Sequence, residues 1–168
     1  IKADSNKNLV KQLEDGGKLI FIRHANAPGN GDPNNFNLND CSTQRNLSKE
    51  GRKQAQLIGV FFKENKIQID KVLSSEWCRC KETAKIAFKD FSTNDFLNSF
   101  YSSKYAKNKE KQIEMLNDYV KEFKSDQNLI FVTHYVLISE VINYAPSSGE
   151  IVVSDKNFNI IGSIEIDF

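Results

Sequence analysis

Two short stretches of the chain are apolar at nearly every position, and they restrict the possible folds more than any other feature. They are Lys18–Arg23 (KLIFIR) and Asn128–Thr133 (NLIFVT), each the length of one strand. A strand that is apolar at consecutive positions needs cover on both faces, as in a parallel sheet between two layers of helices. A third strand is predicted over Lys71–Ser74 (KVLS). The sequence therefore predicts an α/β fold of three α/β/α layers with a mostly parallel central sheet.

The segments between these strands have the patterns of covering helices. Ser48 is a suitable N-cap for a helix with Ala55, Ile58 and Phe62 on one side. The other predicted helices are Asn6–Asp15, Glu76–Phe88, Lys104–Lys124 and Val136–Ile142. Near the C-terminus, Glu150–Ser154 and Asn159–Ile166 alternate like the two strands of a hairpin that turns near residues 155–157. No linker or repeat interrupts the series, so residues 1–168 are predicted to form a single domain.

Two connections lack any periodicity. Ala25–Leu47 is rich in Asn, Gly, Pro and Asp, and Phe91–Ser103 carries scattered aromatic residues. An irregular connection as long as the first is usually functional when it lies inside a small domain. No apolar run approaches the ~20 residues that cross a bilayer, so no membrane span is expected.

The charged residues exclude one class of partner and indicate another. Lys and Arg total 23 against 22 Asp and Glu, a net charge of +1, so the chain lacks the broad basic surface that nucleic-acid binding requires. Only four of the cations are arginines: Arg23, Arg45, Arg52 and Arg79. Where a sequence otherwise uses Lys, each Arg suggests a need for the planar fork that binds phosphate or carboxylate.

Both histidines of the chain stand directly after a predicted buried strand. His24 follows the first apolar run and His134 follows the second, while Arg79 begins the helix after the strand KVLS. In open α/β sheets the ligand site lies at the carboxyl ends of the strands. With Arg23 beside His24, two imidazoles and two guanidinium groups are expected at one edge of the sheet. Such a set suits a phosphoryl group, and a neutral imidazole can attack phosphorus.

Four motifs resemble the histidine phosphatase (phosphoglycerate-mutase-like) superfamily. Ile22-Arg23-His24-Ala25 resembles its Arg-His-Gly motif, with Ala25 in place of the usual Gly. The other three are Leu47-Ser48-x-x-Gly51-x-x-Gln54-Ala55, Ser74-Ser75-x-x-x-Arg79-x-x-x-Thr83-Ala84 and Val132-Thr133-His134. They occur in the family's order from about residue 18 to 142. The chain has neither a Gly-rich phosphate loop followed by Lys-Ser/Thr nor a G-x-S-x-G elbow.

The resemblance implies a phosphatase that needs no metal or cofactor. His24 would be the nucleophile that forms a phosphohistidine, Arg23 and Arg79 would clamp the phosphoryl group, and His134 would donate a hydrogen bond to it. The substrate would be a phosphorylated small molecule or a phosphoprotein. The short chain resembles the compact bacterial phosphatases of the superfamily, which include enzymes directed at phosphohistidine.

The proton donor for the leaving group stays unassigned in the sequence. Larger members of the family carry an acidic residue after the second arginine motif, where this chain offers only Asp95, and Tyr135 rather than an acid follows His134. We therefore consider Asp32, Asp40 and Glu150 as candidates. Arg45, Asp32 and Glu150 are predicted to contact the substrate. Arg52 is predicted to lie on a helix surface, facing Glu or solvent.

The aromatic residues near these motifs are candidates for the rim of the pocket. Core packing is the commoner fate of such side chains, so at most two are expected to contact substrate. The candidates are Phe36, Trp77, Phe96, Phe100, Tyr101 and Tyr135.

The three cysteines bear on the compartment. Cys78 and Cys80 are too close in sequence to pair readily, so a single disulfide would join Cys41 to one of them, and three reduced thiols are an alternative. A zinc site is a third option, although Cys-x-Cys without a nearby third ligand lacks structural-zinc spacing. With the start of the chain at Ile1 rather than Met, a disulfide would favour a periplasmic or exported protein. Otherwise the protein would be cytoplasmic.

Two rival functions follow from the same residues. The missing acid and Ala25 are compatible with a weakly active or inactive protein that binds a phosphorylated ligand. The Cys and His residues are compatible with a metal or redox protein. Turnover of a phosphate ester separates the first rival from an enzyme, and sensitivity to chelator or reductant identifies the second.

Overall fold

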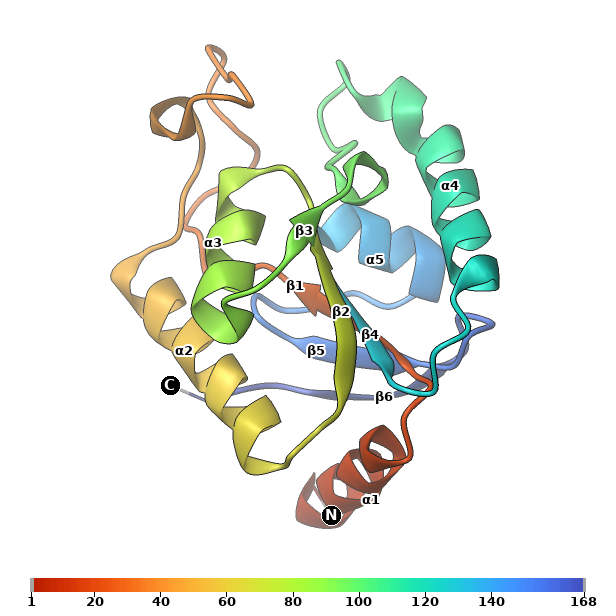
Figure 1. The fold of residues 1–168 in the computed structure, drawn as a ribbon. Helices are drawn as coiled ribbons and strands as arrows, with labels where there is room; N and C mark the ends of the chain where they lie inside the picture. Colours follow the sequence, from red (N-terminus) through yellow and green to blue (C-terminus); the bar gives the residue numbers. More distant parts are fainter. Residues whose placement is uncertain (1, 168) are drawn as a thin grey trace.

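The computed structural model describes residues 2–167, and its centre is a six-stranded sheet (Figure 1). Its strands are β1 (Leu19–Arg23), β2 (Ile69–Ser74), β3 (Ser92–Thr93), β4 (Asn128–Thr133), β5 (Ile151–Ser154) and β6 (Ile160–Ile164). They lie in the order β3-β2-β4-β1-β5-β6. The first four in that order pair in parallel, and β5 and β6 are antiparallel. The predicted mostly parallel sheet with a C-terminal hairpin is confirmed.

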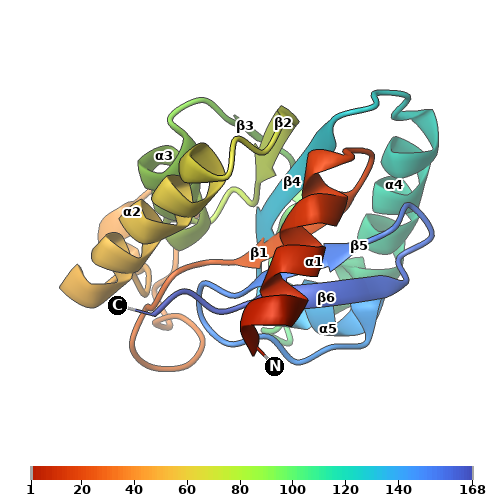
Figure 2. The same ribbon diagram turned by 90° about the horizontal axis from the view of Figure 1, so that it is seen from below.

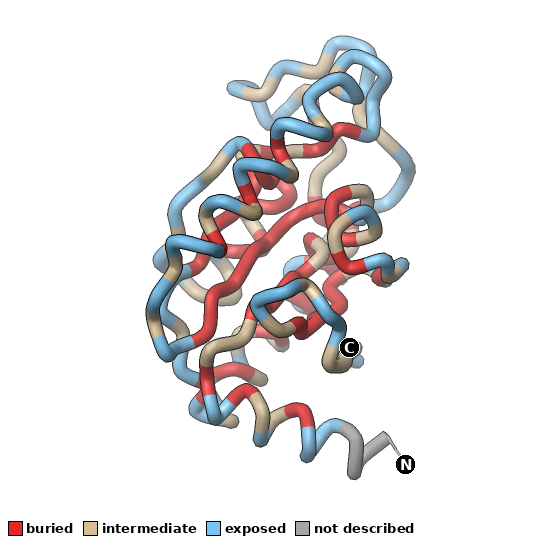
Figure 3. Tube along the Cα trace, turned by 90° about the vertical axis from the view of Figure 1, so that its right-hand side faces the viewer, coloured by how far each residue is buried: buried red, intermediate tan, exposed pale blue. Residues whose placement is uncertain are grey.

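Helices cover both faces of the sheet, as the continuous apolar strands require. They are α1 (Lys2–Glu14), α2 (Lys49–Glu64), α3 (Cys78–Phe88), α4 (Lys109–Glu122) and α5 (Tyr135–Ile142). Ile20 and Ile22 of β1 pack with α1, α2 and α3, whereas Leu19 and Phe21 pack with α4 and α5. Figure 2 shows the sheet between α2 and α3 on one side and α4 and α5 on the other, and Figure 3 shows buried residues concentrated along its strands. The three-layer α/β/α arrangement is therefore confirmed.

A close backbone approach fixes the chain just beyond β1. Ser48 caps α2 by accepting a hydrogen bond from the Gly51 backbone N–H at 3.0 Å. The Asn26 carbonyl accepts from the Ser48 N–H at 3.0 Å, and a Cβ on Gly51 would lie 2.1 Å from that same oxygen. Only glycine fits there, so the start of α2 is pressed against the segment that follows His24.

The structure corrects several element boundaries. The helix predicted from Lys104 begins only at Lys109, because residues 104–108 form a turn and the 3₁₀ segment Ala106–Asn108. The irregular stretch after α3 contains β3, which adds an edge strand beside β2, and the 3₁₀ turn Asp95–Leu97. Further, α1 begins at Lys2 and β2 at Ile69, both earlier than predicted, while α3 begins two residues later. Within residues 2–167, no helix combines the length and apolarity needed to cross a membrane.

Candidate active site

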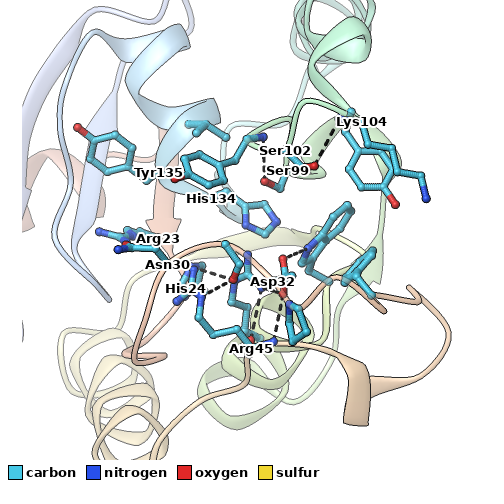
Figure 4. A pocket seen from close by; sticks show the side chains of 18 of the residues that line it. Arg23, His24, Asn30, Asp32, Arg45, Ser99, Ser102, Lys104, His134 and Tyr135 are labelled. Atoms are coloured by element: carbon cyan, nitrogen blue, oxygen red, sulfur yellow. Dashed lines mark hydrogen bonds and ion pairs between the residues drawn. The ribbon is translucent and has the colours of Figure 1, made fainter.

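A cavity of about 580 Å³ opens at the carboxyl ends of the parallel strands (Figure 4). His24 follows β1, His134 follows β4, and Arg79 lies in the first turn of α3, shortly after β2. Arg23, Asp32 and Arg45 also line the cavity. The structure thus brings together six of the seven residues predicted for the site.

The imidazole of His24 is held in a single tautomer. Its Nδ1 lies 2.9 Å from the Ala25 carbonyl oxygen, which can only accept, so Nδ1 carries the proton. The Nε2 atom accepts a hydrogen bond from Nε of Arg79 at 3.3 Å. Burial, and then the charge of Arg79, hold the pKa of His24 well below its ordinary value of 6.5. At neutral pH the ring is therefore uncharged, with the Nε2 lone pair beside a guanidinium group.

Ala25 fits where the family's motif has Gly. Its side chain is fully buried, and its backbone N–H donates to Oγ1 of Thr83 at 3.0 Å. The carbonyl of the same residue orients His24. With Ala at this position, the backbone contacts that follow β1 and orient His24 are in place.

Arg79 is buried and carries the one carboxylate contact among the described residues of the cavity. Its Nη1 lies 2.8 Å from Oδ1 of Asp32. Asp32 also accepts from the Arg45 backbone N–H at 3.1 Å and from Nε1 of Trp77 at 3.1 Å. Burial raises the pKa of Asp32, but the hydrogen bond and charge of Arg79 outweigh it, so the net pKa lies below 3.8. The carboxylate of Asp32 is ionised, and both of its oxygens accept hydrogen bonds from neighbouring residues.

Arg23 and Arg45 add positive charge to the cavity, and their guanidinium groups are held by different hydrogen-bond partners. Arg23 donates from Nη1 to the Pro146 carbonyl at 3.0 Å and lies over the Tyr135 ring. Its Nε is buried without a hydrogen-bond partner among the described residues, so this donor is available to a ligand. Arg45 donates from Nε to Gly31 O at 2.7 Å and from Nη1 to Ala27 O, and thereby braces the long loop. Burial lowers the pKa of both arginines.

His134 faces His24 across the cavity, with 5.8 Å between ring centroids. Its Nε2 lies 2.8 Å from Oγ of Ser75 and 3.5 Å from Sγ of Cys80. Because Ser75 occupies Nε2, Nδ1 is the ring nitrogen left for a ligand. Burial, and then Arg79, lower the pKa of His134 well below 6.5. A bound dianion would favour protonation of this ring and so create a charged donor.

Glu150 does not reach the cavity. Its Oε1 accepts from the Ser147 backbone N–H at 2.9 Å, and its Oε2 accepts from the Tyr144 hydroxyl. The prediction that Glu150 contacts substrate or donates a proton is wrong, because both carboxylate oxygens are turned toward the segment before β5. Asp40 is exposed and caps the 3₁₀ turn Cys41–Thr43.

Two further predicted residues lie outside the cavity. Asp95 lines a separate cavity of about 410 Å³. Arg52 is exposed on α2 and pairs with Glu82 at 2.8 Å, as its predicted place on a helix surface implies.

A disulfide joins Cys41 of the long loop to Cys78 at the start of α3. Arg79 is the next residue, so the bridge fastens the loop that carries Asp32 and Arg45 to the helix turn that carries Arg79. Cys80 is buried and unpaired by disulfide, and burial raises its pKa to about 12. Among residues 2–167, no group of three or more His, Cys, Asp or Glu side chains has an arrangement that could hold a metal ion.

Several residues that contact this site had no predicted role, and Ser75 and Tyr105 are two of them. Ser75 belongs to a quoted motif, and its position one residue beyond β2 places it on the same sheet edge as His134. Tyr105 lines the cavity from a segment predicted as helix. The argument that located His24 and His134, that residues directly after a parallel strand lie at the ligand-binding edge of the sheet, would also have found Ser75 if it had been applied to hydroxyl side chains. No sequence signal identifies Tyr105.

The chain matches the family model of the histidine phosphatase superfamily (branch 1) over residues 19–98. No curated protein sequence matches the chain. Solved structures with the same fold include the protein histidine phosphatase SixA complexed with tungstate. It is 15% identical with a TM-score of 0.57, over 88% of this chain and 96% of that one.

Two other similar structures come from Thermus thermophilus and Escherichia coli. The first is a phosphoglycerate mutase, 15% identical with a TM-score of 0.58, over 89% of this chain and 99% of that one. The second carries a provisional assignment as an α-ribazole-5′-phosphate phosphatase, 17% identical with a TM-score of 0.61, over 82% and 89% of the two chains. At these identities the likeness concerns the fold.

Proposed function

Because the chain belongs to the histidine phosphatase superfamily, we propose that it is a phosphatase that hydrolyses a phosphomonoester or phosphoramidate through a phosphohistidine on His24. The observation that carries the proposal is the tautomer of His24. Its Nδ1–H is held by the Ala25 carbonyl, and the unprotonated Nε2 faces the cavity's guanidinium groups. A neutral imidazole beside an anion-binding group is the nucleophile that this reaction needs.

The reaction proceeds in two displacements. The Nε2 lone pair of His24 attacks phosphorus, and the bond from phosphorus to the leaving group breaks with its electron pair going to the leaving group. Water then attacks phosphorus, and the P–N bond breaks with its electron pair returning to Nε2, so His24 is neutral again. One proton of the water stays on the inorganic phosphate that is released, and the other passes to solvent. Arg23, Arg79 and His134 bind the equatorial oxygens, where charge is largest in the transition state.

Arginine side chains supply the cationic charge in this mechanism, so it requires no metal. The unpartnered Nε of Arg23 and the planar fork of Arg79 support this assignment. Arg45 contributes positive potential while it braces the loop. The substrate is a phosphorylated small molecule or a phosphoprotein.

We also propose that the protein works in an oxidising compartment, either the periplasm or outside the cell. The Cys41–Cys78 disulfide supports this, since such bonds persist mainly in oxidising environments.

The function is tested by hydrolysis of a generic aryl phosphate. His24→Ala is expected to lower kcat by on the order of a thousandfold or more, and Arg79→Ala by about a hundredfold. Arg52→Ala is the matched control, because this exposed arginine pairs with Glu82 outside the cavity and its loss should leave kcat unchanged. Rapid quench in alkaline denaturant with substrate radiolabelled in the phosphoryl group should trap label on the wild-type chain and none on His24→Ala, and the trapped label should be lost in acid. Full activity in His24→Ala would refute the mechanism.

A second candidate, a binder of phosphorylated ligands without turnover, is favoured by one observation. Asp32 occupies Nη1 of Arg79, and no other carboxylate among the described residues lines the cavity as a proton donor. Saturable vanadate binding by a wild-type protein that hydrolyses no substrate would decide for this candidate.

A further inference from the structure

One wall of the cavity is aromatic. The rings of Phe36 and Trp77 are stacked, with centroids 5.1 Å apart and 23° between planes. Tyr105 packs edge-on against both, at 6.2 Å from Phe36 and 5.7 Å from Trp77. All three residues line the cavity, and we call them the aromatic wall. The indole of Trp77 lies 5.5 Å from the ring of His134, so the wall begins beside the residues assigned to the phosphoryl group.

The aromatic wall is held in place by polar and covalent attachments. Nε1 of Trp77 donates to Oδ2 of Asp32, whose other oxygen is bound to Arg79. The Cys41–Cys78 disulfide joins the loop that carries Phe36 to the residue after Trp77. A wall fixed in advance binds a flat ring without the entropy cost of ordering its own side chains.

The same cavity lacks a carboxylic acid that could protonate a poor leaving group. Asp32 is the one carboxylate among the described lining residues, and its pKa is lowered by Arg79. The lining therefore offers no carboxylic acid to the leaving group, which favours a substrate whose leaving group needs none. Phenols ionise at about pH 10, as tyrosine does, whereas an aliphatic alcohol, like water, gives up its proton only at a far higher pH. A phenol oxygen accepts the electron pair of the breaking bond far more readily than an alkoxide.

We infer that the substrate is an aryl phosphate, a phosphoryl group esterified to the oxygen of a phenol. The ring packs against the aromatic wall while the phosphoryl group lies between His24, Arg79 and His134. Attack by Nε2 of His24 breaks the P–O bond, the phenol oxygen keeps the electron pair, and the phenolate takes a proton from water. This inference rests on the proposed function and names the substrate class for the same site.

Four substrates distinguish the contribution of the aromatic ring to kcat/KM from that of a good leaving group. Phenyl phosphate has both the ring and a good leaving group, benzyl phosphate has the ring alone, acetyl phosphate has a good leaving group alone, and ethyl phosphate has neither. We expect the highest kcat/KM for phenyl phosphate. Benzyl phosphate should bind with a similar KM but react with a much lower kcat. A higher kcat/KM for acetyl phosphate than for phenyl phosphate overturns the inference, as does a preference for N-phosphohistidine over phenyl phosphate.

Substitutions of Phe36 test the wall directly. Phe36→Leu keeps a branched apolar side chain but removes the ring, and it should lower the ratio of kcat/KM for phenyl over acetyl phosphate by about tenfold. Phe36→Tyr keeps the ring and should restore the ratio. The control is Phe91→Leu, since Phe91 packs against the core beside α1, α2 and α3 and does not line the cavity. An unchanged ratio in Phe36→Leu overturns the inference.

Failure of the inference is distinguishable from failure of the proposed function. If the ratio is insensitive to Phe36 while hydrolysis still depends on His24, the phosphatase stands and the aryl assignment falls. If the wild-type protein hydrolyses none of the four substrates, both fall. If phenyl phosphate is the best of the four substrates, its kcat/KM is compared with that of a phosphotyrosyl peptide. A higher kcat/KM for the peptide indicates a protein substrate, and a higher kcat/KM for phenyl phosphate indicates a small molecule. Both results agree with an aryl phosphate.

Discussion

The guanidinium group of Arg79 binds the carboxylate of Asp32, with 2.8 Å between Nη1 and Oδ1, while its Nε donates to His24. One side chain thus connects His24 to the long loop. In the proposed mechanism Asp32 competes with the substrate's phosphoryl oxygens for the same donor and repels their charge.

Asp32→Asn should tighten vanadate binding and lower stability. Loss of the carboxylate charge removes the competitor for Arg79, so the Kd for vanadate is expected to fall severalfold by titration calorimetry. The amide also places an N–H₂ group near donors of Trp77 or Arg79, which should cost about 1–3 kcal/mol in the free energy of unfolding. Weaker vanadate binding would show that Asp32 holds Arg79 in position instead.

Ser75→Ala should lower kcat about tenfold with little change in KM. We expect Ser75 to position His134, because its hydroxyl lies 2.8 Å from Nε2 of His134 and also accepts the Trp77 backbone N–H. Without it the His134 ring loses its fixed orientation, and the acid limb of the kcat profile should move. Ser99→Ala is a suitable comparison, since Ser99 lines the cavity from another segment. A pH profile and kcat equal to those of the wild type would exclude the role.

Stability should fall as pH drops below about 6.5. The pKa of both His24 and His134 is lowered well below 6.5 in the folded chain, by burial first and then by Arg79. The unfolded chain therefore binds more protons below that pH, and the free energy of unfolding falls by up to about 1.4 kcal/mol per pH unit for each ring. Above pH 6.5 this contribution is fully present. Urea unfolding in phosphate-free buffer between pH 8 and 5 measures the slope, which should shrink in His134→Asn.

Removal of the disulfide should destabilise the chain by about 4 kcal/mol. The bridge closes a loop with a sequence separation of 37 residues, and the estimate follows from loop-closure entropy. Cys41→Ser/Cys78→Ser is compared with the wild type by chemical unfolding. Thiol titration of the unreduced, unfolded wild type should give one thiol per chain, that of Cys80. Three thiols would contradict the bridge and the oxidising compartment together.

The central part of the fold was predictable because its strands are apolar on both faces, which few other folds require. The edge strand β3 was not, because its two residues, Ser92 and Thr93, are exposed and have no apolar pattern. The start of α4 was also missed. Residues 104–108 are polar and charged like the helix that follows, so periodicity alone could not locate the first turn.

The site was predictable where position on a strand determines it. His24 and His134 follow parallel neighbours in the sheet, and the Arg23 and Thr133 positions pair directly, so their meeting follows from the strand order. Glu150 lies close to the same edge, and its carbonyl accepts from the Arg23 backbone N–H. Its side chain nevertheless turns toward Tyr144. The direction of a side chain at a strand end depends on its local partners, which a sequence pattern does not specify.

The contact between Gly51 and Asn26 has a consequence for the interpretation of inactivating substitutions. A Cβ at residue 51 would lie 2.1 Å from the carbonyl oxygen of Asn26, two residues after His24. In a mutational screen, Gly51 would therefore behave like a member of the active site although it does not line the cavity. Loss of activity on substitution of Gly51 would therefore report a displaced backbone beside His24 rather than the loss of a group that contacts the substrate.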